Sequence, residues 1–185
     1  KLSADGQEAL WNFHYGGRGA DGGTALAVDG DGYVYIAGNT ESFTDAFPVA
    51  QNAVQSVCGE QQYGGEQDCY RDGVVVIFAP SGEPIYATYI GGNKTDVVQA
   101  IAVDANKQIY VAGRTSSDKF PFVNAQQSTC PLDSANGGCY SPQAFVTALA
   151  ASHSEWRFST LLGSSEASGW NEALGLAVDP QRGIL

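Results

Sequence analysis

Several residue types are scarce or missing in this sequence. It contains no methionine, and its 9 lysine and arginine residues are outnumbered by 20 acidic ones, so the formal net charge is −11. Proteins that bind nucleic-acid phosphates need clustered lysine and arginine, which this sequence does not have. No apolar run approaches the roughly 20 residues that a membrane-spanning helix needs. We therefore expect neither a nucleic-acid partner nor a membrane span.

Signatures of catalysis and metal binding are also missing. The chain has no Gly-x-Ser-x-Gly, no His-Glu-x-x-His and no phosphate-binding glycine loop. His14 and His153 have no histidine, cysteine or carboxylate at ligand spacing. Residues 29–32 (DGDG) resemble the start of a calcium loop but lack the later ligands of the EF-hand pattern. We expect no catalytic residue, no cofactor, no metal site and no enzymatic activity, with calcium at residues 29–32 as the alternative.

The sequence does have an internal repeat, the signature of a repeat architecture. Residues 25–29 (ALAVD) recur as 100–104 (AIAVD) and begin a third copy at 174–179 (LGLAVD), with Val28 and its counterpart Val103 spaced by 75 residues. Each copy carries runs rich in Val, Ile, Tyr, Phe and Thr, which are typical of strands and not of helices. In the complete copy, the expected strands are residues 24–29, 33–38, 73–79 and 85–90.

Short connections predict how these strands are arranged. Residues 30–32 (GDG) and 80–84 (PSGEP) carry turn residues, so the strands on either side form hairpins and the sheet is antiparallel. Four-stranded antiparallel sheets that repeat are typical of β-propeller blades, because one sheet cannot bury both faces until its neighbours pack on them. We expect an all-β fold with about two and a half blades of an incomplete or larger propeller, since a ring has typically four to eight blades.

The expected parts all belong to one propeller domain within a longer polypeptide. They are the end of a preceding blade, two complete blades with a disulfide loop each, and the first part of a further blade: residues 1–17, 18–92, 93–163 and 164–185.

The repeat also resembles a known family. It is similar to the SBBP repeat of seven-bladed β-propellers at four motifs of its second copy: Tyr-Ile-Gly-Gly at 89–92, Ala-Ile-Ala-Val-Asp at 100–104, Tyr-Val-Ala-Gly-Arg-Thr at 110–115 and Phe-Pro at 120–121. The resemblance implies extracellular or surface-exposed modules, mostly without an assigned activity, and it transfers no catalytic residue. The chain departs from the family in its longer loops before the third strand, which carry cysteines.

All four cysteines lie between the second and third strands of the two repeats. Four cysteines allow three pairings, and one pair per repeat favours Cys58 with Cys69 and Cys130 with Cys139. Disulfides persist in oxidising compartments, so we expect a secreted protein, outside the cell or at its surface. A four-cysteine metal site is the alternative, and the absence of Cys-x-x-Cys argues against it.

Acidic residues recur at two positions of the repeat. Asp29, Asp104 and Asp179 follow the first strand, and we interpret them as turn-forming side chains that accept backbone N–H groups. Asp21 and Asp96 precede the first strand, where a cation-binding ring at the mouth of the channel is one interpretation.

Two function classes remain. We expect a non-catalytic extracellular module for scaffolding, adhesion or assembly, such as a component of a surface layer or filament, whose partners are other blades of the same polypeptide or neighbouring subunits. The alternative is the propeller domain of a secreted carbohydrate-active enzyme or glycan-binding protein. Trp170, in a Gly- and Ser-rich insertion, would stack on a glycan or partner. If the propeller carries an enzyme's site, Trp170, Glu166 and Glu172 are its first candidates. Asn93 begins an Asn-Lys-Thr sequon and is a candidate glycosylation site.

Overall fold

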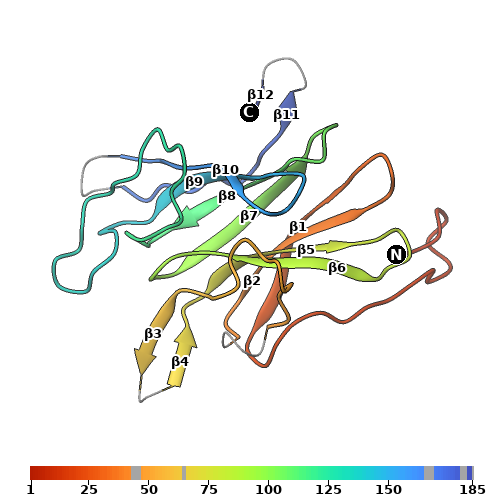
Figure 1. Ribbon diagram of the computed structural model, residues 1–185, viewed down its shortest axis with the longest axis horizontal. Coiled ribbons are helices and arrows are strands. Elements are labelled where there is room, and N and C mark those ends of the chain that lie inside the picture. Colours follow the sequence, from red (N-terminus) through yellow and green to blue (C-terminus); the bar gives the residue numbers. More distant parts are fainter. Residues whose placement is uncertain (43–46, 64–65, 165–168, 180–182, 185) are drawn as a thin grey trace.

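The computed structural model describes the chain except for residues 43–46, 64–65, 165–168, 180–182 and 185, and side chains at 60–69 and 183–184 are also outside the description. The fold is all-β, as predicted, and the described residues form no helix, hence none that could cross a membrane. Two four-stranded antiparallel sheets lie against each other and do not close into a ring (Figure 1).

The first sheet forms from the first complete copy of the repeat. In spatial order it contains β1 (Asp21–Val28), β2 (Val34–Thr40), β5 (Asp72–Phe78) and β6 (Pro84–Ile90). All seven residues of β5 are buried, which explains why its sequence is a continuous apolar run and does not alternate. The four strands agree closely with the runs predicted from the sequence.

The second sheet repeats this arrangement in the next copy. Its strands are β7 (Asp96–Val103), β8 (Ile109–Thr115), β9 (Gln143–Leu149) and β10 (Trp156–Leu162), again joined in chain order. The first pair of strands shifts register between Gly23 and Ala25 in one sheet and between Val98 and Ala100 in the other. The two sheets therefore share their topology and the position of a bulge.

Two short hairpins complete the secondary structure of the described residues. β3 (Glu60–Tyr63) pairs with β4 (Glu66–Cys69) inside the long connection of the first sheet, and β11 (Val178–Asp179) pairs with β12 (Gly183–Ile184) near the end of the chain.

The N-terminal segment differs from its prediction. Residues 10–17 match the fourth strand of the repeat, but in the structure they join no sheet, and the segment forms only the isolated bridge between Leu2 and Ala9. A strand-like sequence needs a neighbouring strand to pair with, and none lies beside this one. Its aromatic residues instead pack on the first sheet, where Trp11 stacks on Phe78 at 6.2 Å between ring centroids.

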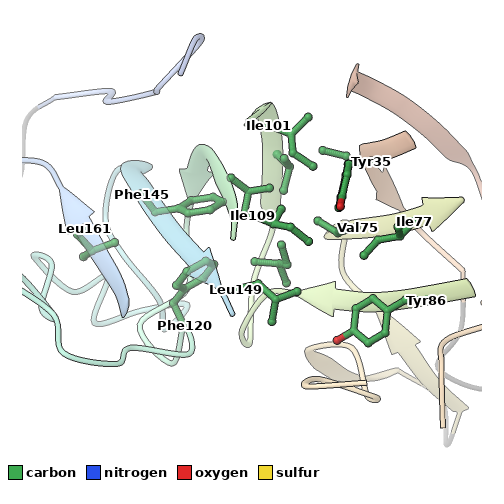
Figure 2. Packing of buried hydrophobic residues seen from close by; sticks show 14 residues of the cluster. Tyr35, Val75, Ile77, Tyr86, Ile101, Ile109, Phe120, Phe145, Leu149 and Leu161 are labelled. Carbon is green, nitrogen blue, oxygen red and sulfur yellow. The ribbon is translucent and has the colours of Figure 1, made fainter. Parts of the chain in front are cut away.

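The main core lies between the two sheets (Figure 2). Strand β7 contacts β1, β2 and β5, so the innermost strand of the second sheet lies across the first sheet. Tyr35, Val75 and Ile77 come from the first sheet, and Ile109, Phe145 and Leu149 from the second. Each is 2% exposed or less. Burial of one such side chain contributes about 1.5–3 kcal/mol, so packing of one sheet on the other accounts for much of the stability.

Candidate functional site

The two ends of the sheets differ in what they carry. At one end, which we call the long-loop end, β1 and β5 begin and β2 and β6 finish, as do their counterparts in the second sheet. It carries the connections 41–71, 91–95 and 116–142. At the other, the turn end, only short hairpin turns such as residues 29–33 and 79–83 connect the strands. All the predicted cysteines, the sequon and Trp170 therefore fall at the long-loop end.

Asp96 is the most enclosed acidic residue at the long-loop end. It is 0% exposed, and its Oδ2 accepts hydrogen bonds from the Gly92 N–H at 2.6 Å and the Ser117 hydroxyl at 2.8 Å. Asp21 makes the equivalent contacts with the Gly17 N–H and the Ser42 hydroxyl. In each blade, this carboxylate therefore fixes the segment before the first strand, β1 or β7, by accepting hydrogen bonds from it. The interpretation of Asp96 as part of a cation-binding ring at a channel mouth is wrong, because the side chain is fully buried.

A second buried carboxylate, Asp72, lies beside Asp96. The Asp96 N–H donates to the carbonyl of Arg71 at 2.7 Å, which brings the start of β7 against the start of β5. Asp72 is also 0% exposed and accepts one hydrogen bond, from the Gly59 N–H at 2.7 Å. Burial, and secondly the charge of Asp96, raise the pKa of Asp72 to about 9. Burial also raises the pKa of Asp96, against the opposing effect of its hydrogen bonds from Thr115, Gly92 and Ser117.

Trp170 lies on the surface with one charged neighbour. Its side chain is 66% exposed, and the guanidinium of Arg114 lies 4.9 Å from the ring centroid. Arg114 Nε also donates to Glu172 Oε1 at 3.0 Å, and Gln99 Nε2 donates to the same oxygen at 2.9 Å. Glu172 is therefore held by two side chains of the second sheet. Glu166, the other acidic candidate, lies outside the described residues.

The same positions in the first sheet make a different contact. Thr24 Oγ1 and Asn39 Nδ2 both donate to the Val98 carbonyl, at 2.9 Å and 3.3 Å, and Asn39 Oδ1 accepts from the Val98 N–H at 2.8 Å. Thr24 and Asn39 stand 75 residues before Gln99 and Arg114. Two equivalent positions therefore bind different groups. In the first sheet they hydrogen-bond to the backbone of Val98, and in the second they hydrogen-bond to the carboxylate of Glu172.

The sequon asparagine is engaged by protein groups. Asn93 is half-buried, its Nδ2 donates to Asp118 Oδ1 at 2.8 Å, and its Oδ1 accepts from the Lys119 N–H at 3.1 Å. A glycan attached at Nδ2 would compete with the contact to Asp118. Glycosylation of Asn93 remains a prediction.

The cysteines close the long connections. Cys130 and Cys139 form a disulfide with a Cα–Cα distance of 5.5 Å. The Cys139 N–H donates to the carbonyl of Ser116 at 2.8 Å, so the bridge is fixed to the end of β8. Cys58 is buried and is also disulfide-bonded, while the side chain of its expected partner, Cys69, lies outside the description.

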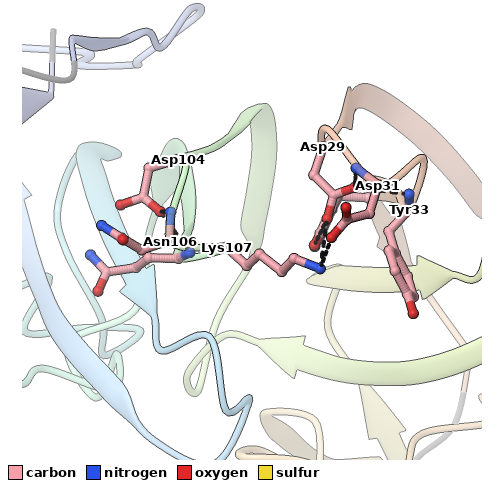
Figure 3. Close-up of polar contacts among 8 residues, drawn as sticks. Asp29, Asp31, Tyr33, Asp104, Asn106 and Lys107 are labelled. Carbon is pink, nitrogen blue, oxygen red and sulfur yellow. Dashed lines mark hydrogen bonds and ion pairs between the residues drawn. The ribbon is translucent and has the colours of Figure 1, made fainter.

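The turn end shows the predicted role of the recurring aspartates (Figure 3). Asp29 accepts hydrogen bonds from the N–H groups of Asp31 at 2.9 Å and Tyr33 at 3.0 Å. Asp104 accepts from Asn106 and Gln108 at 2.8 Å and 2.9 Å in the same way. The turn after Asp179 lies outside the described residues.

Lys107 joins these two turns across the sheets (Figure 3). It has a φ of 64° where its counterpart Gly32 has a φ of 85°. A positive φ is uncommon for residues other than glycine. The Lys107 ammonium lies 2.6 Å from Asp31 and 3.6 Å from Asp29. Lysine at this position therefore forms an ion pair between repeats that glycine could not make.

A third contact between repeats involves His153. It has a φ of 58° in the turn where its counterpart Gly82 has a φ of 92°. The imidazole packs on the Tyr86 ring in a tilted arrangement, 4.8 Å between centroids, and the Tyr86 hydroxyl donates to the His153 carbonyl at 2.9 Å. Burial lowers the pKa of His153. His14 is exposed, far along the chain from His153. No group of three or more His, Cys, Asp or Glu side chains suited to a metal ion occurs in the described part of the chain.

Comparison with known families agrees with this geometry. Residues 85–121 match the family SBBP, a beta-propeller repeat. The chain carries an SBBP-type β-propeller repeat. The match runs from β6 through β7 and β8, so it covers the last strand of one blade and the first two strands of the next. No curated protein matches the chain.

Three residues at the contacts between these propeller blades are not predicted by the sequence pattern. Asp72 was not singled out, although it directly precedes the apolar run of β5. Gln99 and Arg114 have one signal in the sequence. They differ from Thr24 and Asn39, their counterparts when the two repeats are aligned. Their importance depends on contacts between blades, which the repeat pattern of a single blade does not contain.

Proposed function

We propose that the chain is part of a non-catalytic, extracellular β-propeller module for scaffolding, adhesion or assembly, which makes its contacts through the long-loop end. The observation that carries this proposal is that the long connections of both blades, and the disulfide between Cys130 and Cys139, lie at this one end. Disulfides favour an oxidising compartment. A cross-linked loop loses less conformational entropy on binding, which favours a contact surface.

A loop replacement in the full-length protein tests this proposal. Residues 131–138 would be replaced by a Gly-Ser linker of equal length, with the turn at 80–83 replaced by a Gly-Ser linker in a control at the opposite end. We expect the first variant alone to lose self-association or attachment to the producing cell surface, measured by sedimentation velocity and by cell fractionation. Hydrolase or lyase activity that maps to these blades would contradict the proposal, as would equal behaviour of the two variants.

A second candidate function is glycan binding at Trp170. It rests on the exposed indole, which is 66% accessible, and on the adjacent Arg114 and Glu172, which offer polar groups beside an aromatic surface. Aromatic side chains with such polar neighbours are common anchors in binding sites. Titration of soluble glycans should quench tryptophan fluorescence in the wild type and not in W170A, with W156F as the control. No glycan-dependent change in the wild type would exclude this candidate.

A further inference from the structure

Asp72 and Asp96 form a contact between two blades. Each is the first residue of its strand, β5 in one blade and β7 in the next, and each is 0% exposed. The backbone hydrogen bond from Asp96 to the Arg71 carbonyl fixes the two strand ends against each other. The carboxyl of Asp72 packs on Gly91, where an added Cβ would lie 2.6 Å from Asp72 Cγ, and Asp96 accepts from the next residue, Gly92.

The hydrogen bonds of the two carboxyls are unequal. Asp96 Oδ2 accepts two hydrogen bonds, from Gly92 and Ser117, while Asp72 Oδ2 accepts one, from Gly59. Within the part of the chain that the structure describes, Oδ1 of Asp72 has no hydrogen-bond partner, whereas the carboxyl of Asp96 is also stabilised by the Thr115 hydroxyl. A buried carboxylate oxygen without a donor is unfavourable, so one more donor is needed between the two groups.

The basic side chains next to this pair are all engaged elsewhere. Arg71 forms an ion pair with Glu41, Lys94 Nζ donates to the Tyr70 hydroxyl at 3.2 Å, and Arg114 binds Glu172. These three side chains come from the residue before β5, the loop before β7, and β8. The connection after β8 adds Asp118, which accepts from Asn93, and the exposed Lys119. Among the described residues, no cation therefore compensates two adjacent buried charges.

The equivalent joint between the second blade and the following segment is uncharged. The Asn171 N–H donates to the Pro142 carbonyl at 3.0 Å, as Asp96 does to Arg71. This places Gln143 at the position of Asp72 and Asn171 at the position of Asp96. The same backbone contact thus carries two neutral amides in one joint and two carboxyls in the other. Gln143 Nε2 donates to the Ser141 carbonyl and Asn171 Nδ2 to the Gly169 carbonyl, so the second joint buries no pair of ionisable groups.

We propose that Asp72 and Asp96 bind one proton between them, with Asp72 as the acid and Asp96 as the carboxylate, and that this proton holds the two blades together at the long-loop end. The raised pKa of Asp72 agrees with this assignment. Since the folded-state pKa lies above the unfolded value of about 3.9, the contribution of the proton to stability is present at low pH and is lost as the pH rises through the folded pKa.

Thermal unfolding of the whole chain between pH 6 and 10 tests this proposal, in the wild type, in D72N, and in E83Q as a control that removes an exposed acid. The wild type and E83Q should lose Tm steadily from pH 6 and level off above about pH 9, because over this range the unfolded chain has released the proton that the folded pair still binds. The Tm of D72N should stay level, because asparagine donates without ionising. An equal slope in D72N and the wild type, or no slope in the wild type, overturns the proposal.

Carboxyl ¹³C NMR of the wild type provides a measurement that does not depend on a variant that folds. One carboxyl of the pair should titrate above pH 7, and two carboxyls that both titrate below pH 5 would overturn the proposal. Calcium and magnesium chloride, added at pH 8, distinguish a proton from a metal ion. A Tm that rises with either cation in the wild type but not in D72N would show a metal site instead, whereas unchanged values support the shared proton.

Discussion

Replacement of Tyr86 by phenylalanine isolates one hydrogen bond between the two blades. The hydroxyl donates to the His153 carbonyl at 2.9 Å and accepts from the Val54 N–H at 3.1 Å, and the side chain is only 4% exposed. Phenylalanine keeps the ring that packs on His153, 4.8 Å between centroids. The substitution therefore removes one oxygen and leaves two backbone groups without a partner.

The magnitude follows from those two groups. An unsatisfied buried donor or acceptor costs about 1–3 kcal/mol. Both Val54 and His153 are half-buried, so water reaches them in part, and we expect the low end of this range, about 2–3 kcal/mol in total. For a chain of this size, 1 kcal/mol lowers Tm by about 2–4 °C, which predicts a loss of about 4–12 °C.

Urea denaturation and thermal melts followed by circular dichroism would measure this loss. Y33F is the matched control, because no hydrogen bond from the Tyr33 hydroxyl is seen within the described residues, and its effect should stay within about 0.5 kcal/mol. If Y86F unfolds at the same urea concentration as Y33F, the hydrogen bond between blades does not contribute to stability and the reasoning fails.

Three further predictions concern single positions. G38A and G113A should each destabilise the protein by about 1–3 kcal/mol in urea melts, because a Cβ at either position would overlap a carbonyl of the paired strand. The wild type should lose stability as the pH falls from about 6.5 through the folded pKa of His153, which burial lowers; H153N, which tolerates a positive φ, should lose this pH dependence in Tm measurements between pH 4 and 7. Replacement of Cys130 and Cys139 by serine should lower the unfolding free energy by about 3 kcal/mol, as expected for a short closed loop, and an equal Tm with and without reductant would contradict this.

The strands of both blades could be predicted because their signals are local. The sequences of β2 and β8 are mostly apolar and are bounded by turn residues. Asp29 and Asp104 accept hydrogen bonds from N–H groups of the turns, as the turn pattern predicts. The hairpin of β3 and β4 was not predicted, because Glu60–Tyr63 and Glu66–Cys69 are mostly polar and lack the apolar pattern of a strand.

The contacts between blades could not be predicted for a different reason. Asp72 and Asp96 lie close together only because β7 packs across the first sheet, and no spacing in the sequence encodes that distance. Asp96 was noticed as a repeated residue, but repetition alone suggested an exposed ring. Its complete burial depends on the long connections that cover the ends of the strands, and these connections vary most between the two repeats.

The two joints share their backbone geometry and differ in chemistry. Asp96 and Asn171 donate through equivalent N–H groups to the residue before β5 or β9. The side chains around that common contact differ. The first joint has the carboxyls of Asp72 and Asp96 and the hydrogen bond of Asn39 to Val98, whereas the second has the amides of Gln143 and Asn171 and the ion pair of Arg114 with Glu172. A blade placed at the wrong joint would oppose unmatched charges or leave polar groups unpaired, and such penalties are how proteins discriminate between similar partners. Blades of the same topology can therefore be distinguished by the residues that differ between them where the blades meet.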